Sequence, residues 1–518
     1  MRCRLAAANS YGPMTNRRHA ILLFLCVFAA GLTLFSRHNS FPFYYHPDEP
    51  GKVSQLIRHK RNFHHPMMML STVNVARYAV LRGADQKNSQ KVAEVGRWIT
   101  AAMSAAAVAA LALLAFHLFG ALAGWGVGIL GVTNPLLFDL AHYFKEDPWM
   151  MAGIAVFCLA LNAYAEASTM KRLYFLAVAC AMAAAGKYVA FLLLPVALWF
   201  VWSRTEPALR KPRFLRFLGT FAGVWLLFNL SFLTKPGLLF ASLHEEGTKL
   251  AGMTDGVTRK VPHDFYMITQ SMYGGWMVPM IAGLWLVSVV RAPRKISAVE
   301  WMLAALAVSQ FALYSFIPKT AVRYYLPISL ALTFLAIAGQ ARLLAAVRNR
   351  AVLHGCGIAV AVTLVGAAVF FQVQSLRVLD TELKSDDRRD LIAWIRSSLP
   401  ANAVLATDKA VHLPDLRRQE HAGLTPLVQR LVGVEKEVAD VGTVSELRAQ
   451  GVTHVAICER TYLRYLDENK TNKDGSNQTP ERLFYETLLK KGQIVWSSER
   501  GLVSYLRPGI KLVDISRL

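Results

Sequence analysis

Charged residues are scarce in this chain. They make up 18% of its 518 residues, against roughly 25% in an average soluble protein. Acidic residues are especially few in residues 1–374, which hold 14 Asp and Glu but 35 Lys and Arg. Apolar residues make up 54% of the chain. This composition excludes a disordered or fibrous protein and argues against an ordinary soluble enzyme.

Two other features are absent from the sequence. The six cysteines are scattered and form no Cys-x-x-Cys pair, so no zinc site or disulfide framework is indicated. No Gly-x-Gly-x-x-Gly follows a strand pattern and no P-loop sequence occurs. The chain therefore lacks the usual loops that bind the phosphates of a nucleotide.

The net charge of +23 is unevenly placed. Residues 375–518 hold 22 basic and 20 acidic side chains, so nearly the whole excess lies in residues 1–374. There the basic residues stand between long apolar runs, which is typical of a membrane protein. We therefore expect membrane lipids, and not nucleic acid, as the partner of these charges.

The apolar runs predict a polytopic α-helical membrane protein with about eleven transmembrane helices, since a crossing needs roughly 20 largely apolar residues and somewhat fewer are tolerated. The fifth and sixth runs are short, and one long kinked helix is the alternative to two spans. A break at Gly186-Lys187 separates the fifth and sixth helices, because a lysine in the middle of a bilayer is costly. The expected spans are about 20–36, 98–117, 122–138, 149–165, 173–186, 188–202, 214–233, 268–290, 299–317, 324–340 and 354–374.

The basic residues predict the orientation of these spans. With the N-terminus in the cytoplasm, the inner segments carry 17 Lys and Arg, and the outer loops other than the long first one carry 8. The first outer loop then covers about residues 37–97. The first apolar segment is expected to be an uncleaved anchor and not a signal peptide. The chain is therefore expected to be an integral membrane protein with a cytoplasmic N-terminus.

Residues 375–518 are expected to form an extracytoplasmic α/β domain that follows a transmembrane domain of residues 1–374. Apolar runs flanked by turn residues predict its strands, and helical spacing of apolar residues predicts its helices. The expected elements are helices at Arg388–Ser398 and Thr443–Gln450, strands at Ala403–Ala406 and His454–Cys458, and a closing hairpin of Gln493–Trp496 with Leu502–Leu506.

Two pairs of acids are candidates for chemistry. Asp48-Glu49 follows the first span, and Glu146-Asp147 lies between the third and fourth, so both pairs are expected at the outer face. Carboxylates in such a place can act as general bases, attract a cation or hold a metal. The alternative is that each pair only caps a helix, since a proline follows each at a first helical position.

Other polar residues follow in a specific order. His64-His65-Pro66 lies in the first outer loop, Arg97 opens the second span, Lys187 lies at an outer turn, and Arg323-Tyr324 precedes the tenth span. With these residues in this order, and with the stretch 387–408 after the last span, the chain resembles the GT-C membrane glycosyltransferases. More narrowly, it looks like the bacterial relatives of dolichyl-phosphate-mannose protein mannosyltransferases and of the lipid A aminoarabinose transferase.

The resemblance implies an inverting glycosyltransferase that uses a polyprenyl-phosphate sugar as donor. A lipid, a glycan or a protein would be the acceptor. Asp48 then takes a proton from the acceptor. Glu49 and Asp147 orient groups or contact the acceptor, and Asp147 is taken as the match to the family's acid instead of Glu146. The substrate phosphate is assigned to Lys187, Arg323 and His65. No ligand spacing demands a metal, and a divalent metal stays open as a cofactor.

Two other classes of function are compatible with a polytopic membrane chain. A transporter would use the intramembrane charges as a substrate path, although no inverted repeat of broken helices is evident. A non-catalytic membrane scaffold would only present the C-terminal domain. Neither requires the two acid pairs to share one face of the membrane.

The charge distribution makes a testable prediction of topology. A reporter enzyme that is active only outside the cytoplasm should be active when fused after Ile392 and silent when fused after Arg210. The reverse pattern would contradict both the orientation and the placement of the acids at the outer face.

Overall fold

The computed structural model describes residues 13–42, 44–59, 61–252, 276–315, 322–400, 402–411, 413, 430–432, 437–466, 479–502 and 505–518. The chain divides into two units. The first contains Met1–Ser40 and Asp48–Arg377, and the second contains Phe41–Pro47 and Val378–Leu518. Each unit is a packed body with its own core, and the chain passes between them three times.

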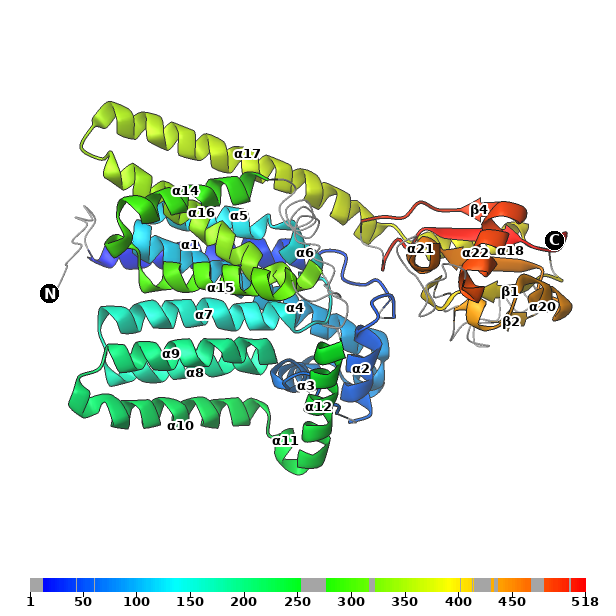
Figure 1. Cartoon of the computed structure of the whole chain (residues 1–518), viewed down its shortest axis with the longest axis horizontal. Helices are drawn as coiled ribbons and strands as arrows, with labels where there is room; N and C mark the ends of the chain where they lie inside the picture. Colours follow the sequence, from blue (N-terminus) through cyan, green and yellow to red (C-terminus); the bar gives the residue numbers. More distant parts are fainter. Residues whose placement is uncertain are drawn as a thin grey trace. The chain divides into compact units, whose positions relative to one another are not determined.

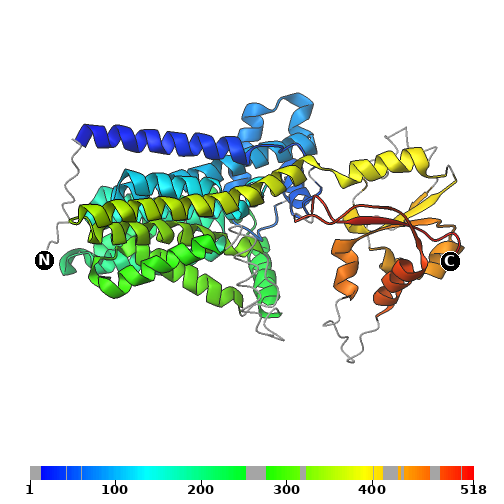
Figure 2. The ribbon, with the colours of Figure 1, turned by 90° about the horizontal axis from the view of Figure 1, so that it is seen from above.

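The first unit is a bundle of helices (Figures 1 and 2). Its helices are α1 (Pro13–Phe35), α2 (Glu49–Ile57), α3 (Met68–Val80), α4 (Ser89–Phe119), α5 (Ala121–Val132), α6 (Pro135–Ala141), α7 (Asp147–Glu166), α8 (Met170–Gly186), α9 (Leu193–Ser203), α10 (Arg210–Phe228), α11 (Ser231–Thr234), α12 (Pro236–Gly252), α14 (Met277–Arg291), α15 (Ala298–Ser315), α16 (Leu326–Ala346) and α17 (Ala351–Lys384). The 3-10 helices η1 (Gly83–Lys87), η2 (Tyr188–Leu192), η3 (Pro207–Leu209), η4 (Pro293–Lys295) and η5 (Val322–Tyr325) connect several of them.

The described parts of the eleven expected spans fall on these helices, so a polytopic helical fold is confirmed. Among the described residues, five helices are long and apolar enough to cross a membrane alone, and the bent pair α5–α6 brings the number to six. Shorter apolar helices include Tyr188–Ser203, Met277–Arg291 and Ala298–Tyr314. The number of eleven crossings stays a prediction. Parts of two expected spans, 268–275 and 316–317, lie outside the described residues.

Small residues let these helices approach closely. Helix α4 is rich in buried alanines and packs against α1, α5 and α7. A side chain added at Gly153 of α7 would place its Cβ 2.4 Å from the Cα atom of Ala183 in α8. Within lipid, where helices gain little from hydrophobic association, such close backbone packing is a main source of stability.

The expected break at Gly186-Lys187 is present. Helix α8 ends at Gly186, and Lys187 has an extended backbone with φ −158° and ψ 139°. The short helix η2 begins at Tyr188, and α9 then packs against α8 (Figure 1). The break places Lys187 at a turn between two helices instead of in the middle of one long helix.

The second unit contains a five-stranded sheet in the order β2-β1-β3-β5-β4. Strands β1 (Val404–Thr407), β2 (Arg430–Val432) and β3 (His454–Cys458) are parallel, and β5 (Ile510–Asp514) runs antiparallel to β3 and to β4 (Gln493–Ser497). Its helices are α18 (Asp387–Ser398), α20 (Val444–Ala449), α21 (Glu459–Leu466) and α22 (Pro480–Lys491), with the 3-10 turns η6 (Lys409–Val411) and η7 (Val438–Asp440). Apolar clusters cover both faces of the sheet.

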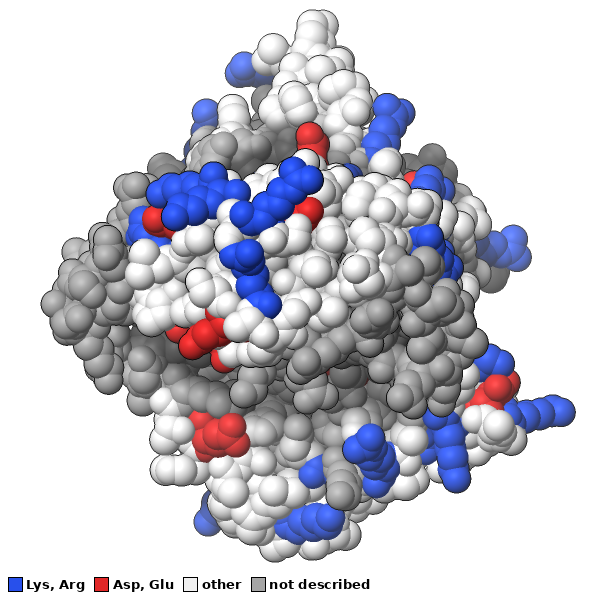
Figure 3. Space-filling model, turned by 90° about the vertical axis from the view of Figure 1, so that its right-hand side faces the viewer, with Lys and Arg blue, Asp and Glu red and all other residues white. Residues whose placement is uncertain are grey.

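The surface of this part of the molecule mixes both signs of charge. Figure 3 shows Lys and Arg side chains interspersed with Asp and Glu side chains on the face that it draws. This agrees with the 22 basic and 20 acidic residues of positions 375–518. The excess positive charge of the chain therefore belongs to the helical unit.

One expectation about the closing hairpin is wrong. Strand β4 pairs with Ile510–Asp514 and not with Leu502–Leu506. Leu502 is 71% exposed, whereas Ile510 and Leu512 are fully buried. Gly509 has a positive φ of 68°, which glycine adopts readily, and the chain enters β5 directly after it. The buried run thus occupies an interior position in the sheet, between β3 and β4.

The segment Phe41–Pro47 is part of the second unit, although in the sequence it lies between helices α1 and α2 of the first unit. Tyr45 is buried, and its hydroxyl donates to both carboxylate oxygens of Asp386, at 2.7 and 2.8 Å. The guanidinium of Arg388 lies 4.0 Å from the centre of the Tyr45 ring. The ring of His46 lies 4.7 Å from the ring of Tyr505.

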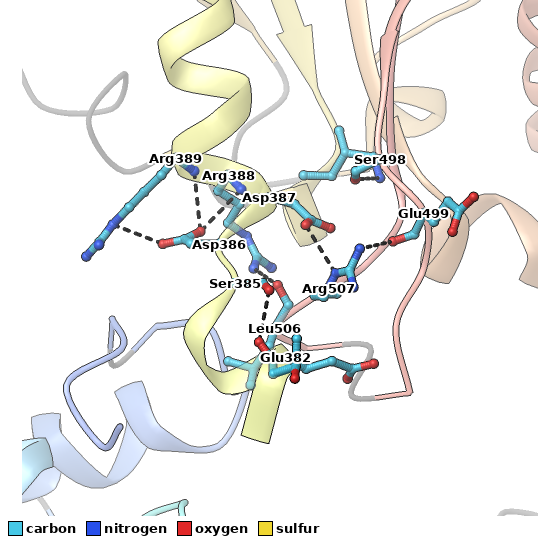
Figure 4. A network of polar contacts seen from close by, with 12 residues as sticks. Glu382, Ser385, Asp386, Asp387, Arg388, Arg389, Ser498, Glu499, Leu506 and Arg507 are labelled. Carbon is cyan, nitrogen blue, oxygen red and sulfur yellow. Dashed lines mark hydrogen bonds and ion pairs between the residues drawn. The ribbon is translucent and has the colours of Figure 1, made fainter. Parts of the chain in front are cut away.

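The partners of Tyr45 are themselves held by a polar network (Figure 4). The buried Arg388 donates to the carbonyl oxygens of Val411, Leu506 and Tyr505 at 2.7 to 3.0 Å. Asp386 caps α18 by accepting from the amide of Arg388. The Asp386 carboxylate and the Arg388 guanidinium are thus fixed by contacts of their own. Tyr45 therefore docks on a preformed surface of its own unit.

We predict that Tyr45→Phe loosens this docked segment. The change removes a hydrogen bond to a charged acceptor, which contributes about 1.5–3 kcal/mol. Amide hydrogen exchange of a peptide covering 41–47, measured on the full chain, should become about 10- to 100-fold faster. Unchanged exchange would contradict this role of the hydroxyl.

Tyr485→Phe is the matched control. The Tyr485 hydroxyl donates to the buried Asp408 at 2.9 Å, elsewhere in the same unit. The control therefore loses an equivalent bond without touching the docked segment. Faster exchange at 41–47 in the control than in Tyr45→Phe would show that the effect is a general loss of stability.

Candidate functional site

Both acid pairs lie at the first turn of a helix, yet neither serves as a side-chain cap. Asp48 is the N-cap residue of α2 and Glu146 that of α7, and neither side chain makes a capping hydrogen bond. Proline occupies a first helical position in both helices, as expected. The capping alternative is therefore wrong, and the carboxylates are directed at residues of other segments.

Glu49 forms the most buried of these contacts. Its carboxylate is fully buried and accepts from Arg97 Nε at 2.9 Å and from a terminal nitrogen of Arg97 at 2.5 Å. The same carboxylate accepts from the backbone amide of Phe144 at 2.9 Å. Arg97 also donates to the carbonyl oxygen of Asn39 at 2.7 Å. This pair joins α2, α4 and the segment before α7.

The second acid pair and its preceding lysine reach back to α2. Lys145 Nζ lies 2.8 Å from a carboxylate oxygen of Asp48, and Lys52 forms a buried ion pair with Glu146. Asp48 and Lys52 are one helical turn apart, so both face the segment 145–146. The two acid motifs, far apart in sequence, thus form one cluster with alternating charges.

A second group of cations lies around Asp147 and Tyr324. Lys187 Nζ donates to Asp147 at 2.6 Å and lies 5.1 Å from the centre of the Tyr324 ring. The guanidinium of Arg323 lies 5.2 Å from the centre of the same ring. The structure therefore brings together three sequence-predicted residues, Asp147, Lys187 and Arg323.

His65 adjoins both groups. The charges of Glu146 and Lys52, and those of Lys187 and Asp147, all act on its imidazole. Burial lowers the pKa of His65 below its ordinary value. A neutral imidazole can still donate one hydrogen bond to a phosphate oxygen, but it adds no charge.

The four acids differ sharply in exposure. The side chain of Asp48 is 39% exposed, whereas those of Glu49, Glu146 and Asp147 are at most 5% exposed. Five cations contact or adjoin these acids: Arg97, Lys52, Lys145, Lys187 and Arg323. The cluster therefore has one accessible carboxylate and a small excess of positive charge.

A metal would have to compete with these lysines and arginines. In the part of the chain that the structure describes, no group of three or more His, Cys, Asp and Glu residues is arranged to hold a metal ion. Each of the four acids already contacts a cationic side chain. The arrangement suits binding of an anion better than binding of a cation.

Three site residues were missed or undervalued from the sequence. Lys52 carried no motif, and only its spacing of three and four residues from the acid pair of α2 could have indicated it. Lys145 counted only as a basic residue of an outer loop, and Tyr324 only as part of an Arg-Tyr step. Their partners come from other helices, so local patterns do not reveal the contacts.

Comparisons with known proteins bear on the fold. No family model matches the chain, and no curated protein matches it. The crystal structure of ArnT from Cupriavidus metallidurans in the apo state is 14% identical over 96% of this chain and 97% of that one, with a TM-score of 0.50. The same protein bound to undecaprenyl phosphate is 15% identical over 97% and 98%, with a TM-score of 0.48.

An archaeal protein shows the same likeness. The oligosaccharyltransferase AglB from Archaeoglobus fulgidus, in complex with an inhibitory peptide and a dolichol-phosphate, is 12% identical over 88% of this chain and 71% of that one, with a TM-score of 0.50. ArnT is a lipid A aminoarabinose transferase, and both proteins are GT-C members. At these identities the likeness concerns the fold, and the chain has a GT-C type fold with a C-terminal α/β region.

Proposed function

We propose that this protein transfers a sugar from a polyprenyl-phosphate donor to an acceptor on the outer face of the membrane, with inversion at the anomeric carbon. Asp48 is the general base in this proposal. The N-terminus is cytoplasmic, the C-terminal domain is extracytoplasmic, and the membrane is a bacterial inner membrane. The fold and the clustered charges support this function.

The exposure of Asp48 among buried, paired acids carries the proposal. A neutral hydroxyl or amine is a poor nucleophile until a positioned base takes its proton. Of the four clustered acids, Asp48 has the most exposed side chain, so an acceptor can reach it. Lys145 Nζ, at 2.8 Å, contacts the Asp48 carboxylate and holds it in position.

The leaving group in this reaction is a lipid phosphate, which gains negative charge as the bond to the sugar breaks. Lys187 and Arg323 are proposed to stabilise that charge, because both lie beside the Tyr324 ring and Arg323 is only half-buried. Asp147 orients Lys187 through the 2.6 Å contact. His65 donates a hydrogen bond to the phosphate, and Glu49 positions α2 through Arg97.

A lipid-linked donor fits the chain better than a nucleotide sugar. The sequence has no loop typical of nucleotide binding. AglB, which has the same fold, has been crystallised with a dolichol-phosphate. A prenyl chain would remain among the apolar helices while its phosphate reaches the cations at the bundle end.

We predict that the protein in liposomes transfers sugar from a polyprenyl-phosphate donor and not from a nucleotide sugar. Asp48→Asn should lower the transfer rate by about two to four orders of magnitude, because it removes the basic oxygen and preserves the shape of the side chain. The measurement is product formation, with one donor at a time and a set of lipid, glycan and protein acceptors.

Asp85→Asn is the matched control for this variant. Asp85 lies in the same outer loop, is half exposed, and pairs with Lys91 at 2.6 Å, so it has the same chemistry outside the cluster. Its transfer rate should equal that of the wild type. Near-normal turnover in Asp48→Asn would remove Asp48 from the role of base, and transfer from a nucleotide sugar alone would overturn the donor class.

We predict further that Arg323→Ala raises the KM for the donor about tenfold or more, since a charged hydrogen bond contributes about 1.5–3 kcal/mol. Arg323→Lys should recover this only in part if the contact is bidentate. For Lys187, the double variant Lys187→Ala/Asp147→Asn avoids a buried unpaired carboxylate. It should raise the donor KM similarly.

Lys91→Ala is the control for both cations, because Lys91 is an exposed basic residue of the outer loop outside the cluster. Its KM should not change. An unchanged donor KM in both cluster variants would show that these side chains contact the lipid interface instead of the donor phosphate.

A further inference from the structure

A cavity of about 540 Å³ lies at the other end of α16, away from Arg323. Helices α5, α16 and α17 supply most of its lining. The lining is largely apolar and includes Trp125, Leu344 and Ile358. A volume of this size falls within the range of small-molecule sites, about 300–1,000 Å³. Its walls suit a hydrocarbon chain.

One polar group in this cavity has no partner. Gln340 of α16 lines the cavity, its side chain is only 7% exposed, and among the described residues no group accepts from its side-chain nitrogen. A buried amide donor without an acceptor costs about 1–3 kcal/mol. The unmet donor matches a ligand that brings a hydrogen-bond acceptor.

The rim of the cavity is basic. Arg348, which follows α16, and His354, in the first turn of α17, both line it. His354 Nδ1 lies 3.2 Å from the carbonyl oxygen of Leu344, which fixes the ring. The residues that line the cavity include no Asp or Glu. The charge at this rim therefore complements an anionic head group.

The spacing of these groups selects the kind of lipid. At 1.5 Å per residue, Gln340 lies about 9 Å along the helix from Ala346, where α16 ends just before Arg348. A glycerophospholipid offers acceptors at two depths, a phosphate at the surface and acyl ester carbonyls below it. A prenyl phosphate has only its terminal phosphate and would leave the deeper amide unmet.

We propose that this cavity is a binding site for an anionic diacyl glycerophospholipid. Its phosphate lies between Arg348 and His354, an ester carbonyl accepts from Gln340, and an acyl chain runs along Trp125 and Ile358. This site is separate from the proposed donor site and does not depend on the proposed reaction.

The test uses the full chain in detergent micelles and the fluorescence of Trp125. Dibrominated phosphatidylglycerol, whose bromines quench tryptophan on contact, is compared with dibrominated phosphatidylcholine. The part of the quenching that Trp125→Phe abolishes reports on the cavity. We expect this part to saturate at concentrations about tenfold lower with phosphatidylglycerol. If this part of the quenching saturates at the same concentration of both lipids in the wild type, the proposal is wrong. That outcome needs no variant of the rim residues.

Variants then locate the contacts. Arg348→Gln and Gln340→Leu should each weaken phosphatidylglycerol binding about 3- to 10-fold, as expected for one lost hydrogen bond. Arg350→Gln is the matched control, because Arg350 is an exposed residue of the same turn that does not line the cavity. If Arg350→Gln weakens phosphatidylglycerol binding as much as Arg348→Gln does, the effect comes from general surface charge and not from a contact in the cavity. Stronger competition by unlabelled polyprenyl phosphate than by unlabelled phosphatidylglycerol would also overturn the proposal.

Discussion

The buried ion pair between Glu49 and Arg97 is the contact on which the rest of the site depends. Both side chains are fully buried, and removing one partner of such a pair typically costs about 3–5 kcal/mol because the other charge stays buried. The Glu49 carboxylate also accepts from the amide of Phe144. One side chain therefore fixes the start of α2 relative to α4 and to the segment that carries Lys145, Glu146 and Asp147.

The residues on either side of Asp48 are anchored in different units. Glu49 is held in the helical unit by Arg97, whereas Tyr45, three residues before Asp48, is held in the C-terminal unit by Asp386 and Arg388. A loop fixed at both ends samples fewer conformations than a loop fixed at one end. The C-terminal unit thus contributes to the order of the segment between α1 and α2.

Helix α16 links the two proposed sites in the helical unit. It begins after Arg323, beside the cations proposed for the donor phosphate, and it ends before Arg348, at the rim of the lipid cavity. At both ends a basic residue stands just outside an apolar helix, where a phosphate and its hydrocarbon chain can each find a suitable surface. A prenyl phosphate and a phospholipid share this requirement, and the depth of the second polar group, Gln340, distinguishes them.

The sequence by itself determined the elements and the types of chemical group. Apolar runs predicted the helices, the break at Gly186-Lys187 followed from the cost of a buried lysine, and the strands of the C-terminal domain came from short buried runs. Strand β2 and helices α21 and α22 were not predicted. The partner of β4 was predicted wrongly, because the buried run Ile510–Asp514 pairs with it instead of a run that begins with the exposed Leu502.

Only the tertiary structure decided which charges meet. Glu49 and Arg97 are separated by 48 residues, Lys52 and Glu146 by 94, and Tyr45 and Asp386 by 341. Helical and strand periodicities extend over a few turns and carry no information about such pairs. The exposure of Asp48, the burial of the other three acids and the docking of residues 41–47 on the C-terminal unit all follow from these long-range contacts, because burial is a property of the packed chain and not of a sequence window.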